Sequence, residues 1–209
     1  MNYLAHIALS GPEREHQIGG FLGDFVKGSL RGERPVAIEQ GIALHRQIDR
    51  WGDSQPEVAN FYRYFDPSWR RYAGIVCDIY FDHLLAKHWQ KLRRDELDNF
   101  CCQFYTDLAE VFELLPEGAQ RFAQTAPKNS WLQGYQYFHH LPVILHRVGQ
   151  RFKKPVALEQ LVNDLSYNHD AIKKDFFSLF PRLQAFSDQQ RQLWRSQTTQ
   201  HMTSAETMQ

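Results

Sequence analysis

Histidine and aspartate residues recur at a spacing of four within two apolar stretches of this 209-residue chain. In the first stretch, His45 and Asp49 fall in the middle of a helical face marked by Ile38, Ile42 and Ile48. Side chains four residues apart are neighbours on a helix, so these two converge on one point. A carboxylate among isoleucines is costly unless a partner compensates its charge. The pattern therefore indicates either a buried, paired carboxylate or two ligands of a metal ion.

The second stretch, residues 67–92, carries Asp78 and Asp82 in the centre of its apolar face. Arg71 lies one repeat earlier on the same face, and a simple ion pair with Arg71 is the structural alternative. Two helices that each bury a pair of candidate ligands favour a site shared between them. Histidine and aspartate together suit Mn²⁺, Mg²⁺ or Fe²⁺ in sites of mixed nitrogen and oxygen ligands.

The other histidines and aspartates are weaker candidates. Asp24 lies in an apolar, glycine-rich stretch, where we expect it to be buried, and Gly20 and Gly23 would let another helix approach closely. His6 has apolar neighbours, and a lone histidine in such surroundings is more often a core residue than a ligand. His83 lies away from the stripe that Asp78 and Asp82 form on its helix. We expect the remaining histidines in solvent (His16, His169 and His201), at the margin of the stripe (His88), or as packing and rim residues (His139, His140 and His146).

The charges of the chain balance, with 24 Lys+Arg residues against 24 Asp+Glu residues. This balance argues against binding to nucleic acid or to a membrane through bulk electrostatics. No apolar run approaches the ~20 residues that span a bilayer. The cysteines Cys77, Cys101 and Cys102 form no Cys-x-x-Cys pair, and their odd number disfavours a disulfide framework. We expect buried cysteines in a protein of the reducing cytoplasm.

The elements that must position these residues are helices. Alternating Val, Ile and Thr residues are nearly absent, so the sequence predicts an all-α, single-domain bundle of many helices over residues 1–190. Residues 191–209 are polar without a sustained apolar stripe, and we expect a partly disordered tail there. The expected helices cover residues 2–9, 14–28, 35–52, 55–65, 67–92, 95–114, 117–126, 129–150, 155–165 and 168–185.

Four motifs follow one another along the chain: MNYLAH at 1–6, FLGDFVKG at 21–28, GIALHRQID at 41–49 followed by Asp53, and RRYAGIVCDIYFDHLLAKHW at 70–89. Weaker similarity continues through WLQGY at 131–135 and FFSLFPRL at 176–183. In these motifs the sequence resembles the bacterial acyl carrier protein phosphodiesterases, over nearly its whole length except the tail.

The resemblance implies an HD-domain-like fold, since this family is similar to HD-type metal-dependent phosphohydrolases, which gather ligands from several helices. It implies hydrolysis of the phosphodiester that joins 4′-phosphopantetheine to a serine of holo-acyl carrier protein, supported by Mn²⁺ or Mg²⁺. The order Asp82-His83 departs from the His-Asp order that names the superfamily, yet the resemblance raises the rank of His83. The metal ligands that it implies are His6, Asp24, His45, Asp49, Asp78, Asp82 and His83.

For such a reaction we expect a metal-activated water to attack phosphorus, with Asp49 or Asp82 orienting the water. Lys27, Arg46, Arg70 or Arg71 would stabilise the developing phosphoryl charge, Arg71 being preferred for its helical angle. His83 or His88 would protonate the serine oxygen. The acidic carrier protein needs a local basic surface, for which the candidates are Lys27, Arg31, Arg34, Arg46, Arg50 and Arg63.

Two other functions fit the same residues. An HD-like phosphohydrolase acting on a small nucleotide or phosphate ester would share the buried ligands but need a closed pocket. A non-enzymatic helical interaction domain would instead pair every buried acid with an arginine. The number of metal ions and the oligomeric state stay open at this point.

Overall fold

Every regular element within residues 1–206 of the computed structural model is helical, which confirms the all-α prediction for the described part of the chain. The structure describes the backbone of residues 1–206 and the side chains of residues 1–196. The α-helices are α1 (Tyr3–Leu9), α2 (Arg14–Leu22), α3 (Val36–Asp53), α4 (Pro56–Phe61), α5 (Ala73–Lys87), α6 (Trp89–Leu92), α7 (Leu97–Glu110), α8 (Glu117–Thr125), α9 (Trp131–Gly134), α10 (Leu141–Gly149), α11 (Val162–Tyr167) and α12 (His169–Glu206). Short 3₁₀ turns join several of them: η1 (Tyr62–Tyr64), η2 (Arg70–Tyr72), η3 (Phe112–Leu114), η4 (Pro127–Asn129), η5 (Phe138–His140) and η6 (Leu158–Leu161).

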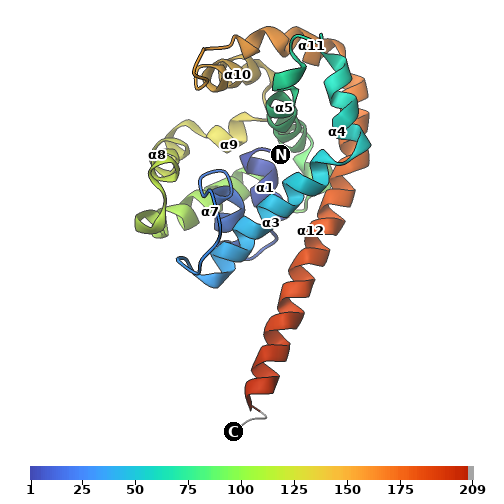
Figure 1. The fold of residues 1–209 in the computed structure, drawn as a ribbon. Helices are drawn as coiled ribbons and strands as arrows, with labels where there is room; N and C mark the ends of the chain where they lie inside the picture. Colours follow the sequence, from blue (N-terminus) through green and yellow to red (C-terminus); the bar gives the residue numbers. More distant parts are fainter. Residues whose placement is uncertain (207–209) are drawn as a thin grey trace.

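Helix α1 is enclosed by the rest of the fold, near the centre of the molecule (Figure 1). It packs against α2, α5 and α12. Six of its seven residues, from Leu4 to Leu9, are buried, as expected for a helix that is apolar around most of its circumference. The side chain of His6 is therefore held inside the fold.

Helices α2 and α3 pack closely because two glycines face each other where they meet. A Cβ atom on Gly19 would lie 2.2 Å from the carbonyl oxygen of Ile38, and one on Gly41 would lie 2.4 Å from that of His16. Only residues without a side chain permit this separation. The close packing brings the end of α2 against the middle of α3, where His45 lies.

Several expected helices are interrupted. The segment 67–92 consists of η2, α5 and α6, and the segment 129–150 contains α9, η5 and α10. Ser130 adopts a left-handed conformation with φ of 46°, and Tyr137 is extended, so the backbone turns at both residues. Helical structure after residue 150 resumes only at Leu158, and the helix expected over 14–28 ends at Leu22. Because Arg71 lies in η2 and not in α5, the prediction that it shares a helical face with Asp78 was wrong.

The final helix passes without a break through the boundary expected at residue 190. Its apolar residues Phe176, Phe180 and Leu183 are buried in the core, and the helix then continues away from the bundle (Figure 1). Helix α12 covers residues 191–206 as well, and the expectation of a partly disordered tail stays a prediction. Its side chains still contact the fold there: Arg191 forms an ion pair with Glu13.

Smaller expectations about single residues are also corrected. His16 is buried, with its ring against the indole of Trp194, rather than exposed to solvent. His169 is half-buried, and its Nδ1 atom lies 2.8 Å from the hydroxyl of Tyr80. Of the cysteines, Cys102 is exposed while the other two are buried. The side chain of His201 lies outside the described residues. Within the described chain, no helix combines the length and the apolar character that crossing a membrane requires.

Candidate metal centre

Three ligand side chains come together from α1 and α3: His6, His45 and Asp49. Nε2 of His6 lies 3.0 Å from Oδ1 of Asp49, and Nε2 of His45 lies 3.2 Å from Oδ2 of the same carboxylate. The two imidazole rings stack with their centroids 3.6 Å apart. Neighbouring ligands of a small divalent cation lie about 3 Å from each other, so these separations fit metal coordination. We refer to His6, His45 and Asp49 as the triad.

The orientation of His45 supports this interpretation. Its Nδ1 donates a hydrogen bond to the carbonyl oxygen of Gly20 at 2.7 Å. A neutral ring with its proton on Nδ1 presents the lone pair of Nε2 to the Asp49 carboxylate, so two acceptors face each other. A cation or a second ring proton satisfies both groups. Histidine ligands of metals usually make such a hydrogen bond through their other nitrogen.

The ionisation states within the triad also suit a metal. Burial, together with the neighbouring His45 ring, lowers the pKa of His6 to about 3, so His6 is neutral at pH 7. Burial alone would raise the pKa of Asp49, but the close rings of His45 and His6 hold it below its ordinary value, and Asp49 is ionised. Neutral imidazole and ionised carboxylate are the forms that bind metals.

The N-terminal ammonium group of Met1 lies beside the triad. Its nitrogen is 2.7 Å from Oδ1 of Asp78 and 3.6 Å from Oδ1 of Asp49. Burial alone would lower the pKa of this amine, but the charges of Asp78 and Asp49 raise it to about 11. The carboxylates of α3 and α5 thus already share one positive charge. The partner of Asp78 is this ammonium group and not Arg71, whose guanidinium lies over the ring of Tyr72.

Asp24 lies at the edge of the triad. Its Oδ1 atom is 3.9 Å from Nε2 of His45, and its side chain is 41 % exposed, so the expected full burial is wrong. Its pKa is nevertheless raised by burial, which outweighs the opposing charge of His45. The expectation of close approach at the glycines is confirmed, because a Cβ atom on Gly23 would lie 2.1 Å from Cγ of His45. Asp53 is exposed at the end of α3.

Asp82 has a different position from the one the sequence indicated. Its fully buried carboxylate accepts hydrogen bonds from the backbone N–H groups of Leu4 at 2.8 Å and Ala5 at 3.0 Å. These N–H groups belong to the first turn of α1 and have no acceptor within that helix. Burial raises the pKa of Asp82 to about 7, although the two hydrogen bonds oppose this shift. Asp82 therefore fixes α1, and with it His6, from a position outside the triad.

His83 likewise lies outside the triad. Its side chain is fully buried, and its Nδ1 donates to the carbonyl oxygen of Tyr135 at 2.7 Å. Burial lowers the pKa of His83 to about 4, so the ring is neutral at pH 7. An enclosed and neutral imidazole is a poor proton donor for a leaving group, which argues against the catalytic role expected for it.

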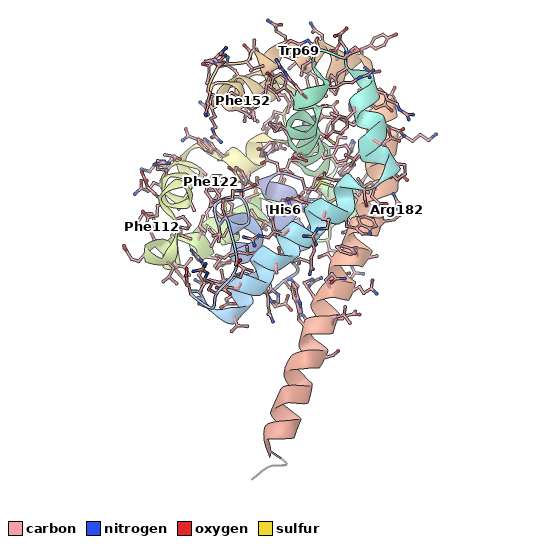
Figure 2. The ribbon with its side chains drawn as sticks, viewed as in Figure 1. His6, Trp69, Phe112, Phe122, Phe152 and Arg182 are labelled. Carbon is pink, nitrogen blue, oxygen red and sulfur yellow. The ribbon has the colours of Figure 1, made fainter. Side chains whose placement is uncertain are left out.

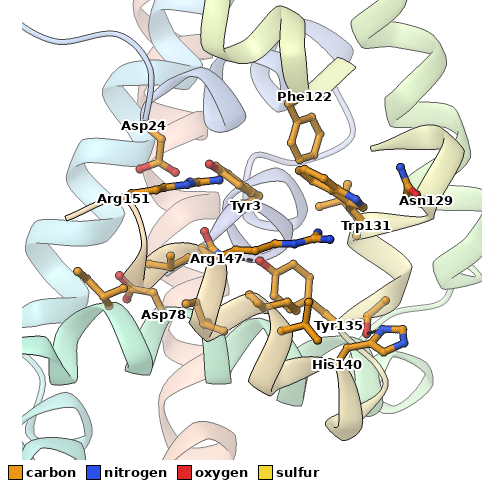
Figure 3. Close-up of a pocket in the computed structure, with 18 of the residues that line it drawn as sticks. Tyr3, Asp24, Asp78, Phe122, Asn129, Trp131, Tyr135, His140, Arg147 and Arg151 are labelled. Atoms are coloured by element: carbon orange, nitrogen blue, oxygen red, sulfur yellow. Dashed lines mark hydrogen bonds between the residues drawn. The ribbon is translucent and has the colours of Figure 1, made fainter. Parts of the chain in front are cut away.

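A half-enclosed pocket of about 880 Å³ adjoins the triad (Figure 3). Asp24 and Asp78 line one end of it together with Met1. Helices α9 and α10 supply the opposite wall, which includes Trp131 and Tyr135. Asp24 and Asp78 are thus the carboxylates that connect the triad with the pocket.

Among the described residues, the arginine side chains that line this pocket are those of Arg147 and Arg151. Sequence reasoning missed both, although their spacing of four and the nearby WLQGY motif were available signals. Lys27 lies close enough for its charge to act on Asp24. The arginines expected at the site lie outside the pocket lining: Arg31, Arg46, Arg50, Arg70 and Arg71. Of these, Arg46 donates a hydrogen bond to the carbonyl oxygen of Val26 at 2.9 Å.

Figure 2 marks His6 in the interior of the fold, where its side chain is fully buried. The ring of His45, which stacks on His6, contacts the backbone at Gly20 and Gly23, and its Nε2 atom faces Asp49. The backbone of α2, rather than any motif of charged residues, determines how the second histidine is oriented.

Comparison with known proteins gives a consistent result. The family model described as acyl carrier protein phosphodiesterase matches residues 1–183. A protein of that name from Klebsiella pneumoniae (strain 342) is 31% identical over 192 residues, which cover 90% of this chain and 98% of that protein. Another from Escherichia coli O6:H1 (strain CFT073) is 32% identical over 187 residues, covering 88% of this chain and 95% of that protein. A third, from Serratia proteamaculans (strain 568), is 31% identical over 184 residues, which cover 88% of this chain and 95% of that protein.

No solved structure matches the chain significantly, so the HD-like part of the fold expectation stays a prediction. The family match includes α1, α3 and α5, which carry the triad and its neighbouring carboxylates. It ends within α12, shortly before that helix leaves the bundle. With every element of the site inside the matched region, the chain belongs to the acyl carrier protein phosphodiesterase family.

Proposed function

We propose that this chain hydrolyses the phosphodiester between 4′-phosphopantetheine and a serine of holo-acyl carrier protein in the cytoplasm. The products are apo-acyl carrier protein and 4′-phosphopantetheine. The observation that carries the proposal is a His–His–Asp triad beside a pocket with two arginines, in a chain whose residues 1–183 match this family. No particular contact favours a nucleotide or a purely structural role.

In this proposal, His6, His45 and Asp49 hold Mn²⁺ or Mg²⁺, with Asp24 and Asp78 as further carboxylates at the rim. When bound, such a cation neutralises phosphate charge and lowers the pKa of water. Mixed nitrogen and oxygen ligands suit Mn²⁺ well, whereas Mg²⁺ prefers oxygen.

The residues of the chain would bind the substrate and direct the water. Asp24 and Asp78 line the pocket and are the carboxylates best placed to orient an attacking water. Both oxygens of Asp49 face the histidines. The water gives up a proton as its oxygen bonds to phosphorus, the bond from phosphorus to the serine oxygen breaks, and the serine oxygen takes up one proton in exchange for the one that the water released. Lys27 and the pocket arginines would balance the phosphoryl charge.

Docking of the acidic carrier protein would use basic residues that are exposed at the surface. Arg31, Arg50 and Arg70 are exposed and free to take this role, and Lys27 is exposed beside Asp24. Such rim charges would act mainly on the association rate and its salt dependence.

The test is incubation of the purified protein with holo-acyl carrier protein and Mn²⁺, followed by mass spectrometry of the carrier protein. We expect loss of the phosphopantetheine mass. His45→Ala and Asp49→Asn should each lower kcat/KM by more than about 100-fold, because each removes a ligand of the triad. They should also weaken Mn²⁺ binding measured by calorimetry.

Asp98→Asn is the matched control, since Asp98 is an exposed aspartate on α7. It should leave both activity and Mn²⁺ binding unchanged. An intact holo-protein, together with turnover of a nucleotide under the same conditions, would instead support the small-substrate alternative.

A further inference from the structure

The pocket beside the triad is larger than a phosphate group requires. Its volume of about 880 Å³ is near the upper end of the range for small-molecule sites, roughly 300–1,000 Å³. Figure 3 shows Asp24, Arg151 and Asp78 toward one end, and Asn129 and His140 toward the other. The reacting phosphorus must lie at the carboxylate end, next to the triad. The remaining length of the pocket is available to another part of the same substrate.

The two pocket arginines reach different parts of this space. Arg151 lies beside Tyr3 and Asp24 at the carboxylate end (Figure 3), where its positive charge opposes the rise that burial causes in the pKa of Tyr3. Arg147 lies between Trp131 and Tyr135, with its Cζ atom 5.8 Å from the centroid of a Trp131 ring (Figure 3). Arg151 is therefore placed for a phosphate near the triad, and Arg147 for polar groups farther along the ligand.

The aromatic walls are poorly placed to stack a nucleobase. Trp131 has Arg147 over its ring, and Phe122 packs against it edge to face with centroids 5.7 Å apart. Tyr3 stacks on Phe25 with centroids 5.9 Å apart. Recognition of a base normally uses an open aromatic face. These covered rings suit a narrow ligand that fills the space between them.

We propose that this pocket binds the phosphopantetheine arm of the carrier protein, with Arg151 at its phosphate and Arg147 along its amide chain. The inference rests on the proposed function and adds which residues recognise the arm. Amide groups of the arm find hydrogen-bond partners in Arg147, Asn129 and His140, and its methyl groups pack against the aromatic walls. After hydrolysis, 4′-phosphopantetheine remains in the pocket while the serine side of the carrier protein is released.

The direct test is calorimetric binding of free 4′-phosphopantetheine to the Mn²⁺-loaded protein. Loss of a charge-assisted hydrogen bond to phosphate should weaken binding by about 10- to 100-fold in Arg151→Gln. Arg147→Gln should weaken it by about 10-fold through the lost amide contacts. Arg151→Lys keeps the charge and should recover part of the affinity.

Arg121→Gln provides the matched control, because Arg121 is exposed on α8 and pairs with Glu117 outside the pocket lining. We expect this variant to bind 4′-phosphopantetheine like the unaltered protein. Thermal unfolding of all four variants checks that the fold is retained.

Kinetics with two substrates separate recognition of the arm from chemistry. Bis(4-nitrophenyl) phosphate is a phosphodiester that lacks the arm. Arg147→Gln should raise KM for the holo-carrier protein by about 10-fold while leaving hydrolysis of the small diester unchanged. Arg151→Gln should impair both substrates.

The outcomes distinguish failure of this inference from failure of the proposed function. If the unaltered protein releases phosphopantetheine from the carrier protein, but both pocket variants match Arg121→Gln, the arm lies elsewhere and only this inference is wrong. If the unaltered protein does not act on the carrier protein at all, the proposed function is wrong. If AMP inhibits hydrolysis of the holo-carrier protein as strongly as free 4′-phosphopantetheine does, the assignment of the pocket to the arm is wrong.

Discussion

The ring of His45 is positioned by backbone atoms of α2 more than by its own helix. Nδ1 donates to the Gly20 carbonyl oxygen, and the absence of a side chain at Gly23 leaves room for the ring. These two contacts aim Nε2 at Asp49. The geometry of the triad thus depends on a residue that offers no ligand itself.

Gly23→Ala tests this dependence. Its Cβ atom would lie 2.1 Å from Cγ of His45, so the ring has to move away from Asp49. We expect the affinity for Mn²⁺ to fall by about 10- to 100-fold in a calorimetric titration. Gly52→Ala on α3 is the control, since the nearest atom to its Cβ would be 3.8 Å away. The control should bind Mn²⁺ normally, and equal affinities of the two variants would contradict the role assigned to Gly23.

The site was predictable from the sequence to the extent that side-chain type and helical spacing determine it. His45 and Asp49 lie on one uninterrupted helix, so a spacing of four was enough to pair them. Asp82 satisfies the same pattern, yet its partners are backbone N–H groups 77 and 78 residues away, which no local spacing reveals. Buried carboxylates serve helix ends as well as metals, and only the tertiary contacts distinguish the two uses.

At the level of elements, the helices that were predicted well are those with strong amphipathic periodicity, such as α3 and α8. The interrupted ones depend on local conformations that the sequence pattern does not encode, such as the left-handed Ser130. That interruption separates α9 from α10, and Arg147 on α10 and Arg151 just after it both line the pocket. The pocket was missed because an unbroken helix over 129–150 would not have formed it.

Helices α4 and α12 are joined by a buried carboxylate. Glu57 accepts hydrogen bonds from Ser178 at 2.7 Å and from Arg182 at 2.6 Å, and its side chain is only 10 % exposed. Burial alone would raise the pKa of Glu57, but these hydrogen bonds lower it below its ordinary value of 4.5. The folded state therefore holds the ionised form more firmly than the unfolded state does.

Glu57→Gln should lower the free energy of unfolding by about 1–2 kcal/mol at pH 7. Because the folded pKa is depressed, this contribution is fully present above pH 4.5 and declines as the pH falls through the folded value. Denaturant titrations at pH 7 and at successively lower pH values should show the difference from the unaltered protein shrinking. Glu113→Gln, at an exposed position, should show no such change. A difference independent of pH would argue against the ionised pairing.

For the whole molecule, α12 has two parts with different roles. Its first half fills the core, and Ser187 donates a hydrogen bond to the carbonyl oxygen of Leu9 at the end of α1. Arg191 and Trp194 then contact Glu13 and His16 near the start of α2. Beyond these contacts, the helix extends away from the bundle (Figure 1).

Two truncations separate these parts. Removal of residues 197–209 should leave activity unchanged, because the family match ends at residue 183. Ending the chain after Phe186 removes the contacts to Leu9, Glu13 and His16 and should cost about 2 kcal/mol, which lowers Tm by about 4–8 °C. Calorimetric melting and the phosphopantetheine-release assay measure both effects. A shorter chain that melts like the full one would show that α12 beyond Phe186 does not support the site.

The contact between Ser187 and Leu9 also bears on the order in which the site can form during folding. Helix α1 is held at its start by Asp82 on α5 and at its end by Ser187 on α12, which lie 78 and 178 residues away from their partners. Contacts between such distant segments close large loops and form slowly. His6 is therefore fixed only after α5 and α12 have both packed against α1, and we expect the triad to acquire its geometry late in folding.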